Sequence, residues 1–188
     1  MTRSFSIGGR MLAPLVTALV VVSGCDDGSS DAVSRVADAP AAREQTPDGT
    51  LKTHEVVPST PTAEGLAYLE AVAGVLRTAD GQTGDARVVT LRGGLALSVP
   101  ADLPEAEIVR LQLATRIAEA QLEADATAAR DLLAPMLDAK RSVPLDRASA
   151  QALIVLGDAA TRTGDDALAA GAYARSIRMM SILREELE

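Results

Sequence analysis

Apolar side chains recur every three or four positions along residues 60–188, which is the spacing of one face of an α-helix. The first such run predicts a helix with Thr60 as its N-cap and Pro61 at its first position, a place that proline favours. Asp80-Gly81 supplies the stop signal for this helix. Its apolar stripe consists of Leu66, Leu69, Val72, Ala73 and Leu76.

Two helices are predicted in the middle of this region. Pro104 and the acids that follow it suit the first turn of a helix that ends near Glu123, because the helix dipole favours negative charge there. Asp125 can then cap a helix that runs to about Lys140. Pro135 falls inside that range, so it should kink or split the helix.

Two more helices are predicted at the C-terminal end. Asp146 can cap a helix from Arg147 to Thr163, and Gly164 should end it. Asp165 can cap the last helix, which runs to the end of the sequence. The region therefore predicts an alternation of helices and short turns.

Residues 85–99 are compatible with two structures. Val88–Leu91 and Leu95–Val99, separated by Gly93 and Gly94, match a β-hairpin with a glycine turn. The same residues match a helix that opens at Asp85 and breaks at the glycines. The imperfect alternation of the hairpin, and the marginal stability of a hairpin on its own, favour the helix. The hairpin stays open as the alternative.

The turns at residues 84–86, 124–126 and 164–166 are spaced 40 residues apart, twice over. A fixed period of this size is typical of stacked helical hairpins. Arg116 interrupts the pattern, because the residues 40 positions before and after it are Leu76 and Leu156. An irregular helical bundle is the alternative interpretation.

The last of these units resembles a tetratricopeptide repeat. By the resemblance, Gly157 and Ala169 let the paired helices approach, and Tyr173 fills the gap between neighbours. Ser176 departs from the family, in which alanine is usual, and the step of 40 residues exceeds the family's period of about 34. The implied fold class is all-α, with two or three stacked antiparallel helical hairpins, the first degenerate or replaced by a small β-hairpin. The residues that carry the resemblance are Leu153, Leu156, Gly157, Ala160, Gly164, Asp165, Ala169, Tyr173 and Ile177.

Tetratricopeptide arrays bind peptides and proteins, so the resemblance implies that role for this chain. Helices in the place of the fifth helix line the binding groove in the family. The corresponding partner surface would consist of Arg147, Gln151, Val155, Thr161 and Arg162.

The C-terminal helix is apolar on more than one face. One stripe consists of Tyr173, Ile177, Met180, Leu183 and Leu187, and Met179 and Ile182 lie off it. The terminal helix of a stacked array should show water a polar side. Either this helix folds back over the earlier hairpins and buries both faces, or Met179, Met180, Ile182 and Leu183 form a contact for a partner or a second copy.

Residues 1–24 have the order of a secretory signal. Arg3 and Arg10 make its start basic, an apolar core runs over residues 11–22, and the small residues Ser23 and Gly24 follow. An uncleaved membrane span is the alternative, but a span needs about 20 apolar residues, and this run is shorter.

The stretch Val22-Ser23-Gly24-Cys25 resembles the lipobox of bacterial lipoproteins. By that resemblance, cleavage falls between Gly24 and Cys25, and Cys25 carries a covalent lipid that anchors the protein to a membrane of the bacterial cell envelope. Two or three acyl chains would hold it there essentially permanently. Asp26 resembles the signal that retains enterobacterial lipoproteins in the inner membrane.

Residues 25–59 predict a disordered tether between the lipid and a folded domain at 60–188. Prolines, glycines and charges are scattered along it, and no apolar period persists, so it cannot bury enough surface to order itself. A chain that begins at Pro58 should therefore melt like one that begins at Asp26.

Composition excludes several function classes. The net charge of −8 argues against nucleic acid, which demands clustered lysine and arginine. Cys25 is the only cysteine and His54 the only histidine, which excludes a Cys/His metal site and nearly excludes Ser-His-Asp and Cys-His catalysis. We therefore expect no cofactor besides the lipid, and a non-enzymatic adaptor. The alternatives are a structural lipoprotein that associates with itself and, less favoured, a cell-wall enzyme that acts through carboxylates.

Overall fold

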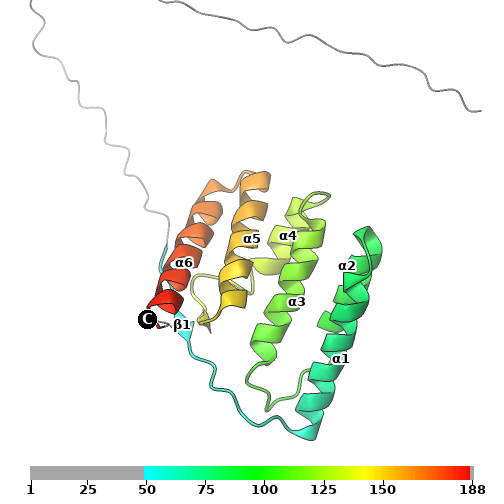
Figure 1. Cartoon of the computed structure of the whole chain (residues 1–188). Helices are drawn as coiled ribbons and strands as arrows, with labels where there is room; N and C mark the ends of the chain where they lie inside the picture. The colour runs from blue at the N-terminus through cyan, green and yellow to red at the C-terminus, as the bar shows by residue number, and fades with distance from the viewer. Residues whose placement is uncertain (1–48, 187–188) are drawn as a thin grey trace, which may run out of the picture. The chain divides into compact units, whose positions relative to one another are not determined.

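The computed structural model describes residues 49–186, which form a stack of helices (Figure 1). Successive helices pack as three hairpins, α1 with α2, α3 with α4, and α5 with α6. The predicted class, all-α with stacked helical hairpins, is confirmed. The elements in chain order are β1 (Thr53–His54), α1 (Ala63–Asp80), α2 (Gly84–Leu95), α3 (Ala106–Gln121), α4 (Ala126–Leu133), β2 (Val143–Pro144), α5 (Arg147–Thr163) and α6 (Asp166–Glu185).

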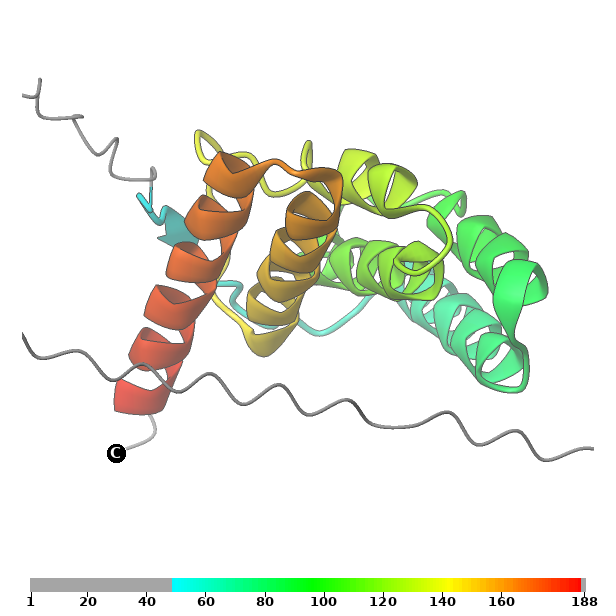
Figure 2. The same ribbon diagram turned by 90° about the horizontal axis from the view of Figure 1, so that it is seen from above.

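Neighbouring hairpins pack through their facing helices. Helix α2 contacts α3, α4 contacts α5, and α3 also contacts α5 directly. Figure 2, seen from above, shows α1, α3 and α5 along one side of the stack, with α2 and α4 along the other. Two apolar clusters fill the interior. The N-terminal cluster lies between α1, α2 and α3, and the C-terminal cluster lies between α3, α4, α5 and α6.

Residues 84–95 form helix α2, so the β-hairpin alternative is wrong. The expected break at the glycines is wrong as well, because the helix continues through Gly93 and Gly94. Gly94 is buried, and a Cβ atom there would lie 2.8 Å from Cγ1 of Val75 on α1. The glycine therefore lets α2 approach α1 closely, which offsets its low helix propensity of about 1 kcal/mol relative to alanine.

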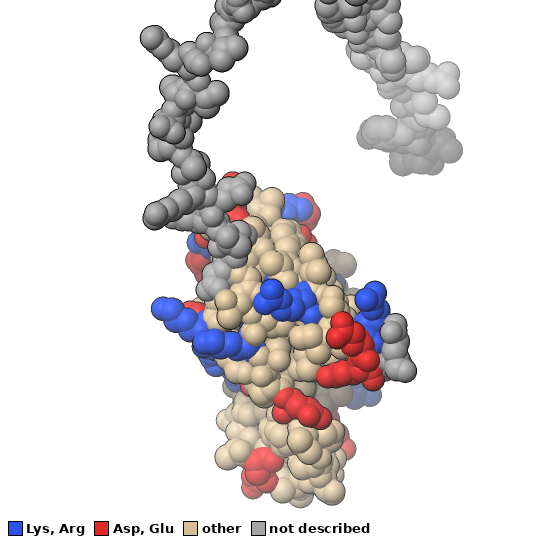
Figure 3. All heavy atoms as spheres, turned by 90° about the vertical axis from the view of Figure 1, so that its left-hand side faces the viewer, with Lys and Arg blue, Asp and Glu red and all other residues tan. Residues whose placement is uncertain are grey.

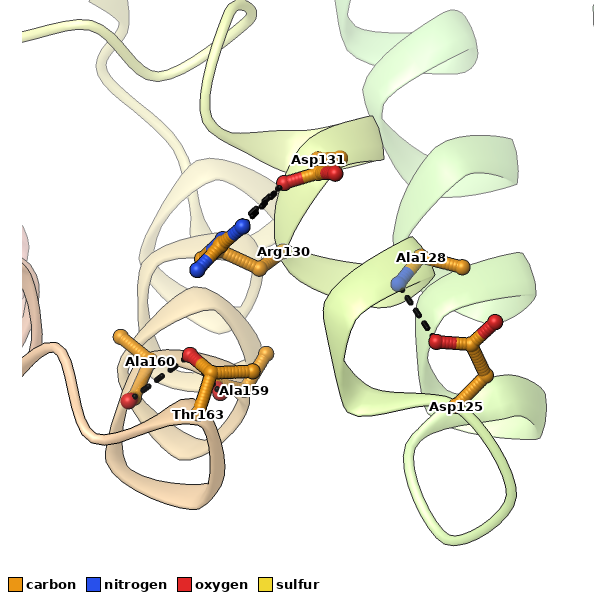
Figure 4. Close-up of polar contacts among 7 residues, drawn as sticks. All are labelled: Asp125, Ala128, Arg130, Asp131, Ala159, Ala160 and Thr163. Carbon is orange, nitrogen blue, oxygen red and sulfur yellow. Dashed lines mark hydrogen bonds and ion pairs between the residues drawn. The ribbon is translucent and has the colours of Figure 1, made fainter.

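Local capping chemistry sets most helix starts and the end of α5. Gly164 ends α5 in the left-handed conformation with φ of 76°, as the sequence predicted. Figure 4 shows the cap of α4 and, at the end of α5, the hydroxyl of Thr163 bonded to backbone carbonyls of the preceding turn. Three aspartates accept hydrogen bonds from backbone amides at the predicted N-caps: Asp125 from Ala128 (2.9 Å), Asp146 from Ser149 (2.7 Å) and Asp165 from Leu168 (3.1 Å).

Three predicted helix ends were wrong. Helix α3 begins at Ala106, so Pro104 precedes the helix and does not lie in its first turn. Helix α1 begins two residues later than expected, because the side chain of Thr62, rather than Thr60, accepts the capping hydrogen bond. Helix α4 ends at Leu133 instead of reaching Lys140. Pro135 accounts for this end, because it has no backbone N–H to continue the helical hydrogen bonds, although Ala134 before it still has helical backbone angles.

Residues 49–57 form a strap that belongs to the folded unit, so the predicted tether boundary at residue 59 was wrong. Strand β1 pairs in parallel with β2, with Thr53 opposite Val143 and His54 opposite Pro144. Leu51 packs against the C-terminal apolar cluster, and Arg178 of α6 donates a hydrogen bond to the backbone oxygen of Gly49 (3.2 Å). The strap (cyan in Figure 1) then leads to α1 at the other end of the stack. The predicted signal, Cys25 and the tether up to residue 48 lie outside the described residues.

Candidate binding surfaces

A groove crosses the first helices of all three hairpins. Its volume is about 540 Å³, and α1, α3 and α5 each contribute side chains to it. Leu76 and Ala148 supply apolar surface, while a hydroxyl, two amides, one carboxylate and two guanidinium groups supply the rest. We call this surface the inner groove; its principal residues are Leu76, Gln112, Arg116, Glu119, Arg147 and Gln151.

Polar pairs join neighbouring hairpins, two of them at the inner groove and the third farther along α5. Such exposed pairs stabilise a fold by at most about 1 kcal/mol each, so their main effect is to fix the spacing of the helices and the direction of the side chains. The pairs are Arg116 with Asp80 (2.9 Å), Gln151 with Glu119 (3.2 Å) and Arg162 with Glu123 (2.6 Å).

The predicted partner residues on α5 divide into three groups. Arg147 and Gln151 are exposed and line the inner groove, and among the described residues Arg147 makes no hydrogen bond or ion pair. Arg162 and Thr161 are exposed farther along α5, where Arg162 is held by Glu123. Val155 is only 3% exposed, so its assignment to the surface was wrong. It faces inward because α5 packs against α3, α4 and α6 together.

The last hairpin holds most of the predicted repeat residues in its interior. A Cβ atom on Gly157 would lie 2.5 Å from the ring of Tyr173, so the ring rests directly on the backbone of α5. The Tyr173 hydroxyl donates to Oδ1 of Asp158 (2.6 Å), and this bond, with burial, raises the pKa of Tyr173 above its ordinary value. Leu153, Leu156, Gly157, Ala160 and Ala169 are buried.

Ile177 and Gly164 are the exceptions among the predicted repeat residues, because both are exposed, Ile177 by 68%. The reverse holds for Met179, which was expected at a partner surface and is fully buried in the C-terminal cluster. Ile182 is half-buried, and Met180 is 46% exposed. The face of α6 that points outward is thus the face of Ile177 and Met180.

A second groove, of about 640 Å³, lies between α5 and α6 at the C-terminal end of the stack. Ile154, Tyr173, Ile177 and Met180 make its floor apolar. Arg147 and Arg184 also line it, and they stand at the same end because α5 begins and α6 finishes there. We call this surface the end groove.

Sequence reasoning missed the contributions of α1 and α3 to the inner groove. The one available signal was Arg116, the charged residue that interrupts the 40-residue pattern. In the structure it lies in the inner groove and pairs with Asp80, so the interruption marks a surface position.

Comparison with protein-family models, with curated proteins and with solved structures found no match. Within residues 49–186, no cluster of three or more His, Cys, Asp or Glu side chains could hold a metal ion. In the same range, no helix combines the length and the apolar character that a bilayer crossing requires. The geometry of the two grooves and the N-terminal sequence therefore carry the functional argument.

Proposed function

We propose that this chain is a lipid-anchored, non-enzymatic adaptor of a bacterial cell envelope, and that its inner groove holds a segment of a protein partner. One observation carries the proposal: three successive hairpins present side chains to a single groove. The anchor is the lipid expected on Cys25, which rests on the resemblance of residues 22–25 to a lipobox.

The dimensions of the inner groove suit a short extended peptide. Packed helices lie about 8–10 Å apart, so α1 to α5 span roughly 20 Å. An extended chain covers about 3.3 Å per residue, which corresponds to roughly six residues across the groove. Gln112 and Gln151 can hydrogen-bond a peptide backbone, because an amide side chain both donates and accepts. Arg147 can bind a carboxylate of the partner.

A carboxylate-dependent enzyme is less well supported by this surface. Glycoside hydrolysis needs two carboxyl groups that face each other across the substrate. Glu119 is the only acid that lines the inner groove, and its Oε1 accepts a hydrogen bond from Gln151 (3.2 Å). The groove therefore suits binding better than hydrolysis.

Photo-crosslinking residues at Gln112 and at Gln151 are expected to capture the same partner in living cells, because the two positions lie on neighbouring walls of the inner groove. Asp131, exposed on α4, is the matched control and should capture none of it. Gln112→Arg should reduce the yield from position 151 at least tenfold without changing the melting temperature. Capture from all three positions alike, or no loss with Gln112→Arg, would exclude the inner groove as the binding site.

Cys25→Ser is expected to abolish membrane attachment, because it removes the only sulfur to which the lipid can be joined. Expressed in a bacterium, the variant should keep its signal uncleaved at residue 24, or appear in the soluble fraction after cleavage elsewhere. The measurement is membrane fractionation followed by detergent phase separation. A variant that is processed like the parent chain and still partitions into detergent would disprove the anchor.

A further inference from the structure

A stripe of side chains runs along the outward face of α6. It has an acidic residue at one end, a basic residue at the other, and apolar or small residues between them. The spacing is 4, 3, 4, 3 and 4, which is the alternation of the a and d positions of a coiled coil. The stripe begins near the start of α6 and reaches its last turn, about 27 Å away at 1.5 Å per residue. Its members are Asp166, Ala170, Tyr173, Ile177, Met180 and Arg184.

All but Tyr173 of these side chains are exposed, and Tyr173 is half-buried. Within residues 49–186, Asp166 and Arg184 make no ion pair or side-chain hydrogen bond. The floor of the end groove beside the stripe includes Ile154 of α5, which is itself exposed. Figure 3 views this side of the molecule, where most of the surface is uncharged and both basic and acidic side chains are scattered over it. An apolar face of this kind on a terminal helix is unusual, because the end of a helical stack normally shows water a polar side.

The stripe is symmetric about residue 175. If two copies of α6 lie antiparallel across a two-fold axis at that level, Asp166 of each faces Arg184 of the other. In the same arrangement Ala170 faces Met180, and Tyr173 faces Ile177. Each layer then joins an a position to a d position, as in antiparallel coiled coils. A two-fold interface uses the same patch on both subunits, so this self-complementarity of charge and size is what it requires.

We propose that the chain forms a two-fold dimer through the outward face of α6, with the two helices antiparallel and the end groove filled by the partner's Ile177 and Met180. The two Asp166–Arg184 pairs would fix the alignment of the helices. A parallel pairing is disfavoured, because it brings the two Asp166 carboxylates together and the two Arg184 guanidinium groups together. The end groove shares only Arg147 with the inner groove, so the other residues of the inner groove stay open on each copy, and the dimer does not depend on the function proposed above.

The dimer also bears on membrane attachment. Arg178, next to the stripe, donates to the backbone of Gly49, so the N-terminal segment of each copy joins the domain beside the interface. Both expected anchors would then start from the centre of the dimer. Two anchors on one particle bind a membrane more firmly than one, because attachment of the first raises the effective concentration of the second.

To test this, two versions of the full chain with different epitope tags are expressed together and extracted in detergent. One tag is captured, and the amount of the other tag that co-purifies is measured. Wild-type chains should co-purify. Ile177→Asp should reduce co-purification at least tenfold while the melting temperature stays within about 2 °C, because the residue is mostly exposed. Co-purification should also fall at least tenfold when both tagged chains carry Asp166→Arg, or when both carry Arg184→Asp. Each combination places like charges face to face.

Mixing the two charge reversals distinguishes the proposed alignment from unspecific adhesion. An Asp166→Arg chain paired with an Arg184→Asp chain has opposite charges at both ends again, so co-purification should return to near the wild-type value. Asp102→Arg makes the same charge change at an exposed residue between α2 and α3, and should have no effect. Co-purification that resists Ile177→Asp, or a mixture no better than the single reversals, would overturn the proposal. Absence of wild-type co-purification would overturn it too.

Discussion

Met179→Gln is expected to destabilise the domain strongly, while Met180→Gln, the same change at the next position, has little effect. Met179 is fully buried in the C-terminal cluster, and Met180 is 46% exposed. Glutamine at position 179 would lose the packing of the thioether and bury an amide among apolar side chains. Together these effects should cost about 3 kcal/mol, or a fall in melting temperature of roughly 10 °C. The free energy of unfolding of the Met180 variant should stay within about 0.5 kcal/mol of the wild-type value.

Thermal unfolding followed by circular dichroism measures both variants on the full chain, with the wild-type chain as reference. Ile182→Gln should fall between them, because Ile182 is half-buried. Equal melting temperatures for the Met179 and Met180 variants would mean that α6 is rotated relative to the structure. In that case the stripe that contains Ile177 would point inward, and the dimer proposed from it would fail together with this prediction.

The sequence predicts best those features that depend on neighbouring residues. The bounds of α5 follow from Asp146 at one end and Gly164 at the other, and both act within a single helical turn. The 40-residue period predicts two or three stacked hairpins because each hairpin must bury its own apolar face against the next. These interactions can be identified from the chain itself, without knowledge of the tertiary arrangement.

The rotation of α6 could not be predicted in this way. The helix is apolar on two faces, so periodicity alone does not determine which face is buried. The structure shows what decides it: the ring of Tyr173 rests on Gly157, and this contact turns Met179 inward and Ile177 outward. Gly157 and Tyr173 were predicted in separate roles and not as a contacting pair, so the rotation of α6 did not follow from the sequence.

The candidate site was predicted only for α5. Arg147 and Gln151 were expected at a binding surface and line the inner groove, whereas Gln112 and Glu119 of α3 were not singled out. Polar residues on an exposed helix face are common, so they gave no distinct signal. Arg116 differed because it stands where the pattern calls for an apolar side chain, and such local conflicts often mark functional positions.

The strap of residues 49–57 was missed because its partners are distant in sequence. Two residues of β1 pair with β2 across about 90 intervening positions, and no local pattern in a short polar segment reveals such a pairing. The isolated Leu51 has no periodic neighbours, yet it packs against the same cluster as Leu153 and Met179. The strap also closes the stack, since it connects the last hairpin to the first helix.

A chain that begins at Pro58 is therefore expected to be less stable than one that begins at Asp26, by about 2 to 4 kcal/mol. The shorter chain lacks Leu51, whose burial contributes up to about 2 kcal/mol. It also lacks the backbone hydrogen bonds from Val143 to Lys52 (3.0 Å) and from Leu145 to His54 (2.9 Å). Their loss would expose Val143, which is now fully buried. The smaller ordering entropy of the shorter chain offsets part of this loss.

Urea unfolding of both chains measures the difference, and point variants separate the strap's packing from an effect of chain length. Leu51→Ser should lower the free energy of unfolding by about 1 to 2 kcal/mol, because this substitution removes the apolar contact and keeps the backbone pairing. Val57→Ser is the matched control: Val57 lies in the same strap but is 69% exposed, so its substitution should change stability by less than about 0.5 kcal/mol. If the two chains unfold at the same urea concentration, and Leu51→Ser behaves like Val57→Ser, the strap does not stabilise the fold, and the chain before residue 60 acts as the simple tether that its composition predicts.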